Sequence, residues 1–222
     1  MANLSLFDII GPIMVGPSSS HTAGAAKIGK YASNFIHGKL KKVTFFLYGS
    51  FAKTYRGHGT NKALLGGVLG YDASSEELLL AEKIAEEREV SFEYILGEKE
   101  DVHPNYVEIW MEDTEGYVTT VSGESIGGGA VRIRSINGID TDLDGELTAI
   151  ITHHLDRVGI LTEISSFLSS RGVNIATVNL YRASRGRSAY MALEVDGDID
   201  PEVTEELKGS INDLIDVFVI EV

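Results

Sequence analysis

Two histidines in glycine- and serine-rich surroundings are the residues of this sequence best suited to acid–base chemistry. His58 is flanked by glycines on both sides, and His21 directly follows three serines, Ser18–Ser20. Glycine has no side chain and tolerates positive φ, so the backbone can come close to a bound molecule at such positions. An imidazole with a pKa near neutrality is suited to proton abstraction. The two segments therefore predict a site for a small polar molecule.

Side chains of the kind that bind anions surround both histidines in the sequence. Hydroxyls, an amide and cations occur between residues 50 and 62: Ser50, Lys53, Thr54, Arg56, Thr60, Asn61 and Lys62. The serines and Thr22 precede an apolar pattern with helical spacing over residues 25–36, so they are placed at a helix start. The free N–H groups of a helix start attract carboxylates and phosphates. A plain helix cap beside a surface histidine is the simpler interpretation of the same residues.

Charge is distributed unevenly along the chain. The net charge is −14, yet the first 71 residues contain one acidic residue and eight lysines or arginines. The acidic remainder argues against nucleic-acid binding, while the basic first third, which holds both histidine motifs, fits an anionic ligand. No run of apolar residues is long enough to span a membrane, and the amino terminus lacks the pattern of a signal peptide. We expect a cytoplasmic protein.

The absence of cysteine restricts the chemistry of the chain itself. With no cysteine in 222 residues, disulfides, zinc–thiolate sites, cysteine-ligated iron–sulfur clusters and cysteine nucleophiles are all excluded. A third glycine-rich segment, residues 125–130, is a weak motif by itself. None of the glycine runs has the spacing of a phosphate-binding loop or of a dinucleotide fingerprint. We expect no metal ligands on this chain.

Hydrophobic periodicity predicts an α+β protein with two domains. In residues 1–138 we expect a helix from about residue 23, a strand at 43–48 and a helix at 63–69, followed by a helix over 74–89 that starts with a capping box of Ser74 and Glu77. Further strands are expected at 90–95, 106–111, 117–121 and 131–136, and residues 3–14 are a helical turn or an edge strand. Residues 139–146 are interpreted as a linker, and a calcium loop there is disfavoured because no bidentate glutamate follows.

Residues 147–222 show the order strand, helix, strand, strand, helix, strand. The expected elements are strands at 147–152, 173–182, 188–195 and 214–222 and helices at 159–170 and 201–210. This order within about 75 residues is that of a ferredoxin-like βαββαβ domain. The segment Ala149–Leu161, followed by Gly172–Ile175, closely resembles an ACT domain. The resemblance implies an amino-acid effector beside Asp156, Arg157, Gly159 and Asn174, or pairing of two copies without a ligand.

The first domain resembles the beta subunit of bacterial iron–sulfur-dependent L-serine dehydratase. The resemblance is carried by Gly16–Thr22, Gly49–Thr54 and Gly57–Thr60, and with the ACT-like part it covers the chain. It implies an alpha subunit whose cysteines hold a [4Fe-4S] cluster, and conversion of L-serine to pyruvate and ammonia. It also implies a fold shared with a regulatory, substrate-binding domain of some phosphoglycerate dehydrogenases. Asn61 stands where such proteins often have aspartate.

This resemblance gives the site residues their predicted roles. His58 is the base for the α-proton and His21 a second imidazole, while the substrate is held by Ser18, Ser19, Ser20, Thr22, Ser50, Thr60 and Asn61. An open iron position on the partner would act as a Lewis acid on the serine hydroxyl. Two alternatives stay open: a non-catalytic amino-acid-binding regulatory subunit, and a regulatory fragment of a dehydrogenase. We expect a homodimer through the ACT domain.

Overall fold

The computed structural model describes residues 13–144, 147–182 and 184–220. Backbone contacts divide the chain into two compact units, and the division falls within residues 139–145. Among the described residues, the strands form one six-stranded sheet and one four-stranded sheet. Helices and strands are therefore mixed in both units, and the predicted α+β class is confirmed.

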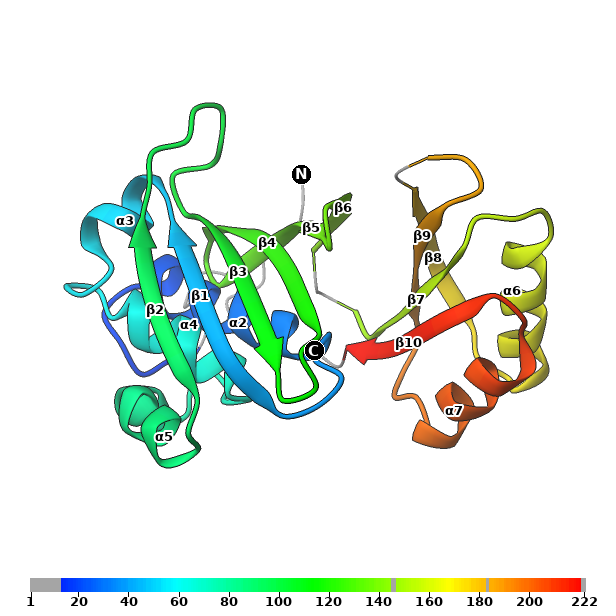
Figure 1. Cartoon of the computed structure of the whole chain (residues 1–222), viewed down its shortest axis with the longest axis horizontal. Coiled ribbons are helices and arrows are strands. Elements are labelled where there is room, and N and C mark those ends of the chain that lie inside the picture. Colours follow the sequence, from blue (N-terminus) through cyan, green and yellow to red (C-terminus); the bar gives the residue numbers. More distant parts are fainter. Residues whose placement is uncertain (1–12, 145–146, 183, 221–222) are drawn as a thin grey trace, which may run out of the picture. The chain divides into compact units, whose positions relative to one another are not determined.

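The first unit is built on the six-stranded sheet, whose order is β2-β1-β3-β4-β5-β6. Its elements in chain order are the π-helical turn η1 (Ser19–Gly24), α2 (Ala25–Ser33), β1 (Leu40–Leu47), α3 (Gly49–Thr54), α4 (Thr60–Val68), the 3₁₀ turn η2 (Glu76–Leu80), α5 (Ala81–Glu87), β2 (Ser91–Leu96), β3 (Tyr106–Asp113), β4 (Val118–Gly127), β5 (Ala130–Ile136) and β6 (Ile139–Leu143). β2 pairs in parallel with β1, whereas β1 with β3, β3 with β4 and β4 with β5 are antiparallel. The helices α2, α4 and α5 lie on one face of this sheet (Figure 1).

Alternation and small residues explain how these helices pack. The alternate residues Val43, Phe45 and Leu47 of β1 are fully buried, as expected of a strand with one covered face. α2 and α4 come close where both carry glycine: a Cβ at Gly67 would lie 2.1 Å from the Ala26 carbonyl oxygen. The small-residue run that predicted a helix at 63–69 therefore also allows two helix backbones to approach each other.

Several predicted boundaries in the first unit are corrected by the structure. Residues 139–143, interpreted as part of a linker, form β6 and belong to the first sheet. The predicted capping box is wrong, because the helical segment starts as a 3₁₀ turn at Glu76, and its N-cap residue Ser75 makes no side-chain cap hydrogen bond. β4 continues to Gly127 rather than ending at residue 121. The prediction for residues 3–14 lies, up to residue 12, outside the described residues.

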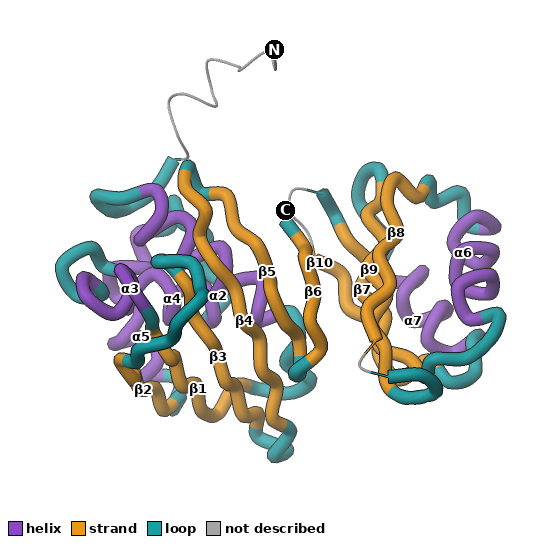
Figure 2. Tube along the Cα trace, turned by 90° about the horizontal axis from the view of Figure 1, so that it is seen from above, coloured by secondary structure: helices purple, strands orange, loops and turns teal. Residues whose placement is uncertain are grey.

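The second unit confirms the predicted βαββαβ order. It contains β7 (Ala149–Leu155), α6 (Ile160–Ser170), β8 (Ile175–Arg182), β9 (Ser188–Val195), α7 (Pro201–Ser210) and β10 (Leu214–Ile220). Its sheet has the order β10-β7-β9-β8 with antiparallel neighbours, and both helices lie on one face (Figure 2). Ile164 and Leu168 of α6 pack against Ile150 and Met191 of the sheet. Leu161, which follows the buried Ile160 in the same helix, is 45% exposed.

Candidate active site

His21 lies in η1 and is held by hydroxyl groups from two different elements. Ser18 is the N-cap residue of η1: its Oγ accepts a hydrogen bond from the His21 backbone N–H at 3.2 Å and lies 3.3 Å from His21 Nδ1. On the other side of the ring, Nε2 lies 3.0 Å from the Oγ of Ser50 in α3. The ring edge also contacts Phe51, with a centroid distance of 5.4 Å. The imidazole is therefore fixed in orientation, with both ring nitrogens engaged.

The second imidazole, that of His58, lies directly beside the first. The ring centroids of His21 and His58 are 4.8 Å apart, and the ring planes are nearly perpendicular. The loop that carries His58 is fastened to η1, because the Thr22 hydroxyl donates to the His58 carbonyl oxygen at 3.2 Å. Gly59 follows with φ +72° and is the N-cap residue of α4, a conformation that glycine adopts without strain. The prediction that the two glycine-rich motifs meet at one place is confirmed.

Burial makes the two histidines chemically different. His21 is 9% exposed, and burial, followed by the proximity of His58, lowers its pKa below the ordinary value, while the hydrogen bond with Ser50 acts in the opposite direction. Its environment therefore favours the uncharged form of His21. His58 is exposed, and its ring nitrogens have no hydrogen-bond partner within the part of the chain that the structure describes. One imidazole is thus held in place and the other is open to a ligand.

The remaining serines of the predicted site lie at the start of the same helical segment. Ser19 and Ser20 are half-buried residues of η1, which continues directly into α2. The third glycine-rich segment adjoins them, since a Cβ at Gly127 would lie 4.0 Å from Ser20 Oγ. Hydroxyls of Ser18 and Ser50 therefore contact the His21 ring, and Ser19 and Ser20 occupy the first two positions of η1 beside it.

Thr60 and Asn61, predicted as substrate contacts, lie in a different environment from that of the serines. Thr60 is fully buried, and its hydroxyl has no hydrogen-bond partner among the described residues. The Asn61 amide donates to the Glu82 carboxylate of α5 at 2.9 Å, and the Asn61 carbonyl oxygen accepts from the Tyr94 hydroxyl at 2.8 Å. Burial, followed by the negative charge of Glu82, raises the pKa of Tyr94. Asn61 thus joins α4 to α5 and β2 and makes no hydrogen bond to the imidazole pair.

In the second unit, the charged residues predicted to contact an effector are engaged in ion pairs. The Asp156 carboxylate accepts from the Gly186 N–H at 3.0 Å and from Arg182 at 3.2 Å, and these contacts lower its pKa. Arg157 donates to both oxygens of Glu163, at 2.8 and 2.7 Å, and to Asp213 at 2.8 Å. The two side chains therefore brace the β7–α6 loop.

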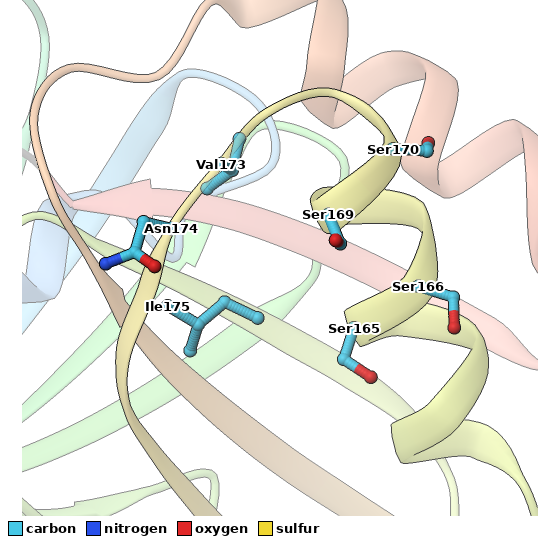
Figure 3. A pocket seen from close by; sticks show the side chains of 7 residues that line it. All are labelled: Ser165, Ser166, Ser169, Ser170, Val173, Asn174 and Ile175. Carbon is cyan, nitrogen blue, oxygen red and sulfur yellow. The ribbon is translucent and has the colours of Figure 1, made fainter.

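The predicted effector residues are also divided between the two ends of α6. Gly159 precedes this 11-residue helix and Asn174 follows it, so a helix about 16 Å long separates them. Asn174 instead lines a cavity of about 610 Å³ with four serines of α6 and two apolar residues, as Figure 3 shows: Ser165, Ser166, Ser169, Ser170, Val173 and Ile175. Its amide donates to Asp196 at 2.6 Å. Within one chain, Asn174 thus lies at the other end of α6 from Asp156, Arg157 and Gly159, and the effector site stays a prediction.

Iron–sulfur clusters need thiolates, and this chain has none to offer. The sequence contains no cysteine, and among the described residues there is no group of three or more His, Asp or Glu side chains that could hold a metal ion. The donor set of this chain therefore does not fit a cluster.

The helices of the described residues are too short or too polar to cross a membrane.

Comparison with protein families identifies both units. Residues 5–135 match the family model of the serine dehydratase beta chain, and residues 148–212 match the ACT domain. The second unit, with the ferredoxin-like topology described above, is thus an ACT domain. The match to the first family covers more than half of the chain, and the chain belongs to the serine dehydratase beta chain family.

Individual relatives agree with this assignment. The chain is 37% identical to the L-serine dehydratase beta chain of Peptoniphilus asaccharolyticus over 95% of its own length and 94% of the relative. It is 39% identical to a Bacillus subtilis (strain 168) protein named a probable L-serine dehydratase beta chain, over 91% of its length and 92% of the relative. A D-3-phosphoglycerate dehydrogenase of the same organism is 27% identical over 89% of this chain but only 37% of its own length. The chain thus matches the two beta chains along nearly their whole length.

Sequence reasoning missed residues that hold the segments around the two histidines without contacting the imidazoles. Glu82 and Tyr94, which hold Asn61, lie on elements that the sequence assigned only to packing. Ser125, the first residue of the third glycine-rich segment, is fully buried, and its hydroxyl has no partner among the described residues. That motif was the available signal, but nothing in the sequence indicated that it would meet η1.

Proposed function

We propose that this chain is the beta subunit of a two-chain L-serine dehydratase that converts L-serine to pyruvate and ammonia. The observation that carries the proposal is the contact between the fixed imidazole of His21 and the exposed imidazole of His58 at a serine-rich helix start. The names of the two beta-chain relatives support the substrate. An acid–base pair next to an anion-binding backbone is what a β-hydroxy amino acid needs for loss of its α-proton.

His58 is the proposed base. An unprotonated nitrogen of its ring takes the α-proton of L-serine, the Cβ–O bond breaks, and the β-hydroxyl leaves as water with that proton. The resulting 2-aminoacrylate hydrolyses to pyruvate and ammonia. Two features support His58 over His21 in this role: its ring is exposed, and its nitrogens are not hydrogen-bonded within the described residues. His21, held by two hydroxyls in an environment that favours its uncharged form, acts as the second imidazole, which orients the site and shuttles protons.

The start of η1 is the proposed site for the substrate carboxylate. Ser18, Ser19 and Ser20 place hydroxyls there, and the helix start supplies backbone N–H groups. Thr22 contributes indirectly, because its hydroxyl holds the His58 carbonyl oxygen. Ser50 contributes through His21. We leave Thr60 and Asn61 out of the proposed substrate contacts, because Thr60 is fully buried and the Asn61 amide is hydrogen-bonded to Glu82.

The complete enzyme is proposed to include an alpha subunit that carries the [4Fe-4S] cluster. This part of the proposal rests on the family and on the absence of cysteine from this chain. The chain alone is then inactive, and we place the complex in the cytoplasm. Co-purification of the tagged chain from its source cells under anaerobic conditions should yield a brown, cysteine-rich partner.

Reconstitution tests the function and the base together. The two chains, combined without oxygen, should release pyruvate from L-serine, and His58→Ala should lower kcat about 100-fold or more because the general base is lost. Lys83→Ala, at an exposed position of α5, is a matched control that should keep kcat. If His58→Ala keeps a near-normal kcat, His58 is not the base. If His21→Ala and His58→Ala together change only KM or cooperativity, the chain is a regulatory subunit instead.

The ACT domain is proposed to bind an amino acid and to pair two copies of the chain. β8 is an edge strand of its sheet, and the apolar side chains Val178 and Leu180 are 40% and 42% exposed on it. An open edge of this kind accepts a strand from a second copy. Val178→Lys should therefore shift the sedimentation coefficient from dimer to monomer, whereas Val118→Lys, at an exposed position of the first unit, should not.

A further inference from the structure

The contact between His21 and Ser50 joins η1 to α3. A single turn of the chain is bonded both to α3 and to Ser125, the residue that packs against η1. That turn is His103–Asn105, between β2 and β3. The Pro104 carbonyl oxygen accepts hydrogen bonds from the N–H groups of Ser50, at 2.6 Å, and Phe51, at 3.3 Å. A Cβ at Gly49 would lie 2.5 Å from the same oxygen, so α3 starts directly against the turn.

The next residue of the turn, Asn105, holds Ser125 at the end of β4. The Asn105 carbonyl oxygen accepts from the Ser125 N–H at 3.0 Å, and the Asn105 side-chain amide donates to the Ser125 carbonyl oxygen at 3.2 Å. The Asn105 N–H donates to His103 Nδ1 at 3.1 Å, which closes the turn. Both the N–H and the carbonyl oxygen of Ser125 are therefore hydrogen-bonded to Asn105.

The Ser125 side chain occupies the space that a side chain at Gly24 would need. Gly24 is the last residue of η1, three positions after His21. A Cβ there would lie 2.0 Å from Ser125 Oγ and 2.7 Å from Ser125 Cβ. The backbone of Gly24 has φ −63° and ψ −40°, a helical conformation that alanine adopts more readily than glycine. Packing against Ser125, and not backbone conformation, therefore requires glycine at position 24.

We propose that Asn105 and Ser125 are positioning residues for the imidazole site: Ser125 fills the notch at Gly24 and holds η1 where His21 reaches Ser50. The same turn carries the Pro104 carbonyl oxygen that holds α3, so both partners of the His21–Ser50 hydrogen bond are placed from one point. The Ser125 hydroxyl has no hydrogen-bond partner among the described residues, so its volume is what acts. The catalytic consequence rests on the proposed function, whereas the placement of His21 does not.

The test is the titration of the His21 imidazole, followed by NMR in the full-length chain without any partner. Gly24→Ala should displace η1, so that His21 loses burial and the pKa of His21 rises toward the ordinary value. His58 is the titrating side chain that faces His21, so its signals must be assigned as well. Gly209→Ala is the matched control, because Gly209 is also helical, in α7, and a Cβ there would meet nothing within 4 Å.

A second substitution at Ser125 makes the test specific. Gly24→Ala with Ser125→Gly should restore the wild-type titration, because both close contacts disappear. Gly24→Ala with Ser125→Ala should restore it only partly, because the 2.7 Å contact with the Ser125 Cβ is kept. Asn105→Ala, which deletes one of the two hydrogen bonds to Ser125, should shift the titration less than Gly24→Ala.

Two results would overturn the proposal. One is an unchanged His21 titration in folded Gly24→Ala; the other is a folded Gly24→Ala/Ser125→Gly variant that still titrates abnormally. If Gly24→Ala does not fold, Asn105→Ala decides, and an unchanged titration there rejects the positioning role. In the reconstituted complex, kcat of Gly24→Ala should fall about tenfold or more with a smaller change in KM, and Ser125→Gly should rescue it. Absence of activity in the wild-type complex would reject the proposed function and leave the titration result standing.

Discussion

The imidazole site of the first unit and the β7–α6 loop of the ACT domain differ in what their polar side chains do. In the first unit, hydroxyls from η1 and α3 hold His21, and the neighbouring His58 ring stays exposed. In the ACT domain, Arg157 is engaged by Glu163 and Asp213, and Asp156 is engaged by Arg182 and Gly186. One arrangement leaves a reactive group open to a ligand, and the other holds its charged groups within the chain.

The difference teaches that a motif indicates where a site lies but not which side chains are available in it. Both loops precede a helix whose N-cap residue is a glycine with positive φ, Gly59 in one and Gly159 in the other. Similar local structure therefore supports a candidate catalytic site in one unit and a braced loop in the other. Four predictions test this comparison.

The largest contrast is between His58 and Arg157. His58→Ala should lower kcat of the reconstituted enzyme about 100-fold or more. Arg157→Ala should keep kcat and instead lower the melting temperature of the ACT domain, because it releases Glu163 and Asp213. Pyruvate formation and calorimetry on the same two samples check both halves. A large loss of kcat in Arg157→Ala without unfolding would show that the ACT loop takes part in turnover.

Asn61 should be the most sensitive polar residue behind the site. Asn61→Asp places a second carboxylate against Glu82 and loses a hydrogen bond to a charged group, so the free energy of unfolding should fall by about 2 kcal/mol. Adding Glu82→Gln should recover most of this loss, because an amide then faces the new carboxylate. Urea unfolding of the single and double variants measures it. Equal stability of Asn61→Asp and the wild type would refute the structural role given to this residue.

The two N-cap glycines form a matched pair. Gly59→Ala and Gly159→Ala each force an L-residue into the left-handed region, at φ +72° and +88°, which costs about 1–2 kcal/mol. Each should destabilise its own unit by this amount, as measured by denaturant unfolding. Only Gly59→Ala should also change kcat, because it follows His58 directly. A change in kcat for Gly159→Ala alone would reverse the comparison.

The smallest expected effect is a dependence of stability on acid pH in both units. His21 and His154 are buried, and burial, named first among the causes, lowers the pKa of each below the unfolded value of about 6.5. The unfolded chain then binds more protons, so each contribution to stability is complete above about pH 6.5 and is lost as pH falls through the lowered pKa.

The variant His154→Gln separates the two units in this respect. His154 is fully buried and its Nε2 has no hydrogen-bond partner among the described residues, so its protonation inside the ACT domain is unfavourable. In His154→Gln, the second unit should lose less stability than in the wild type as pH falls below about 6.5, while the first unit keeps its acid sensitivity. Thermal unfolding at several pH values checks this, and unchanged acid sensitivity of the second unit would contradict it.

Much of the fold could be predicted because it follows from local patterns. The alternation in β1, the spacing of Ile160, Ile164 and Leu168, and Pro201 at the start of α7 all depend on residues close in sequence. Predictions failed where a contact distant in sequence decides the structure. Residues 139–143 are a local exception: they look like a polar linker, yet they form β6, which follows β5 directly after Asn137 and Gly138, a pair of residues typical of a hairpin turn.

The sequence by itself determined which groups this protein can use: two histidines beside glycines, hydroxyls at a helix start, and no thiolate for a cluster. Residue type alone decides these properties. Only the tertiary structure decided that His21 meets Ser50 and His58 and that the Asn61 amide donates to Glu82. These contacts are set by hydrogen bonds and packing between segments about 20 to 100 residues apart in the sequence, as between Gly24 and Ser125. No local pattern predicts them.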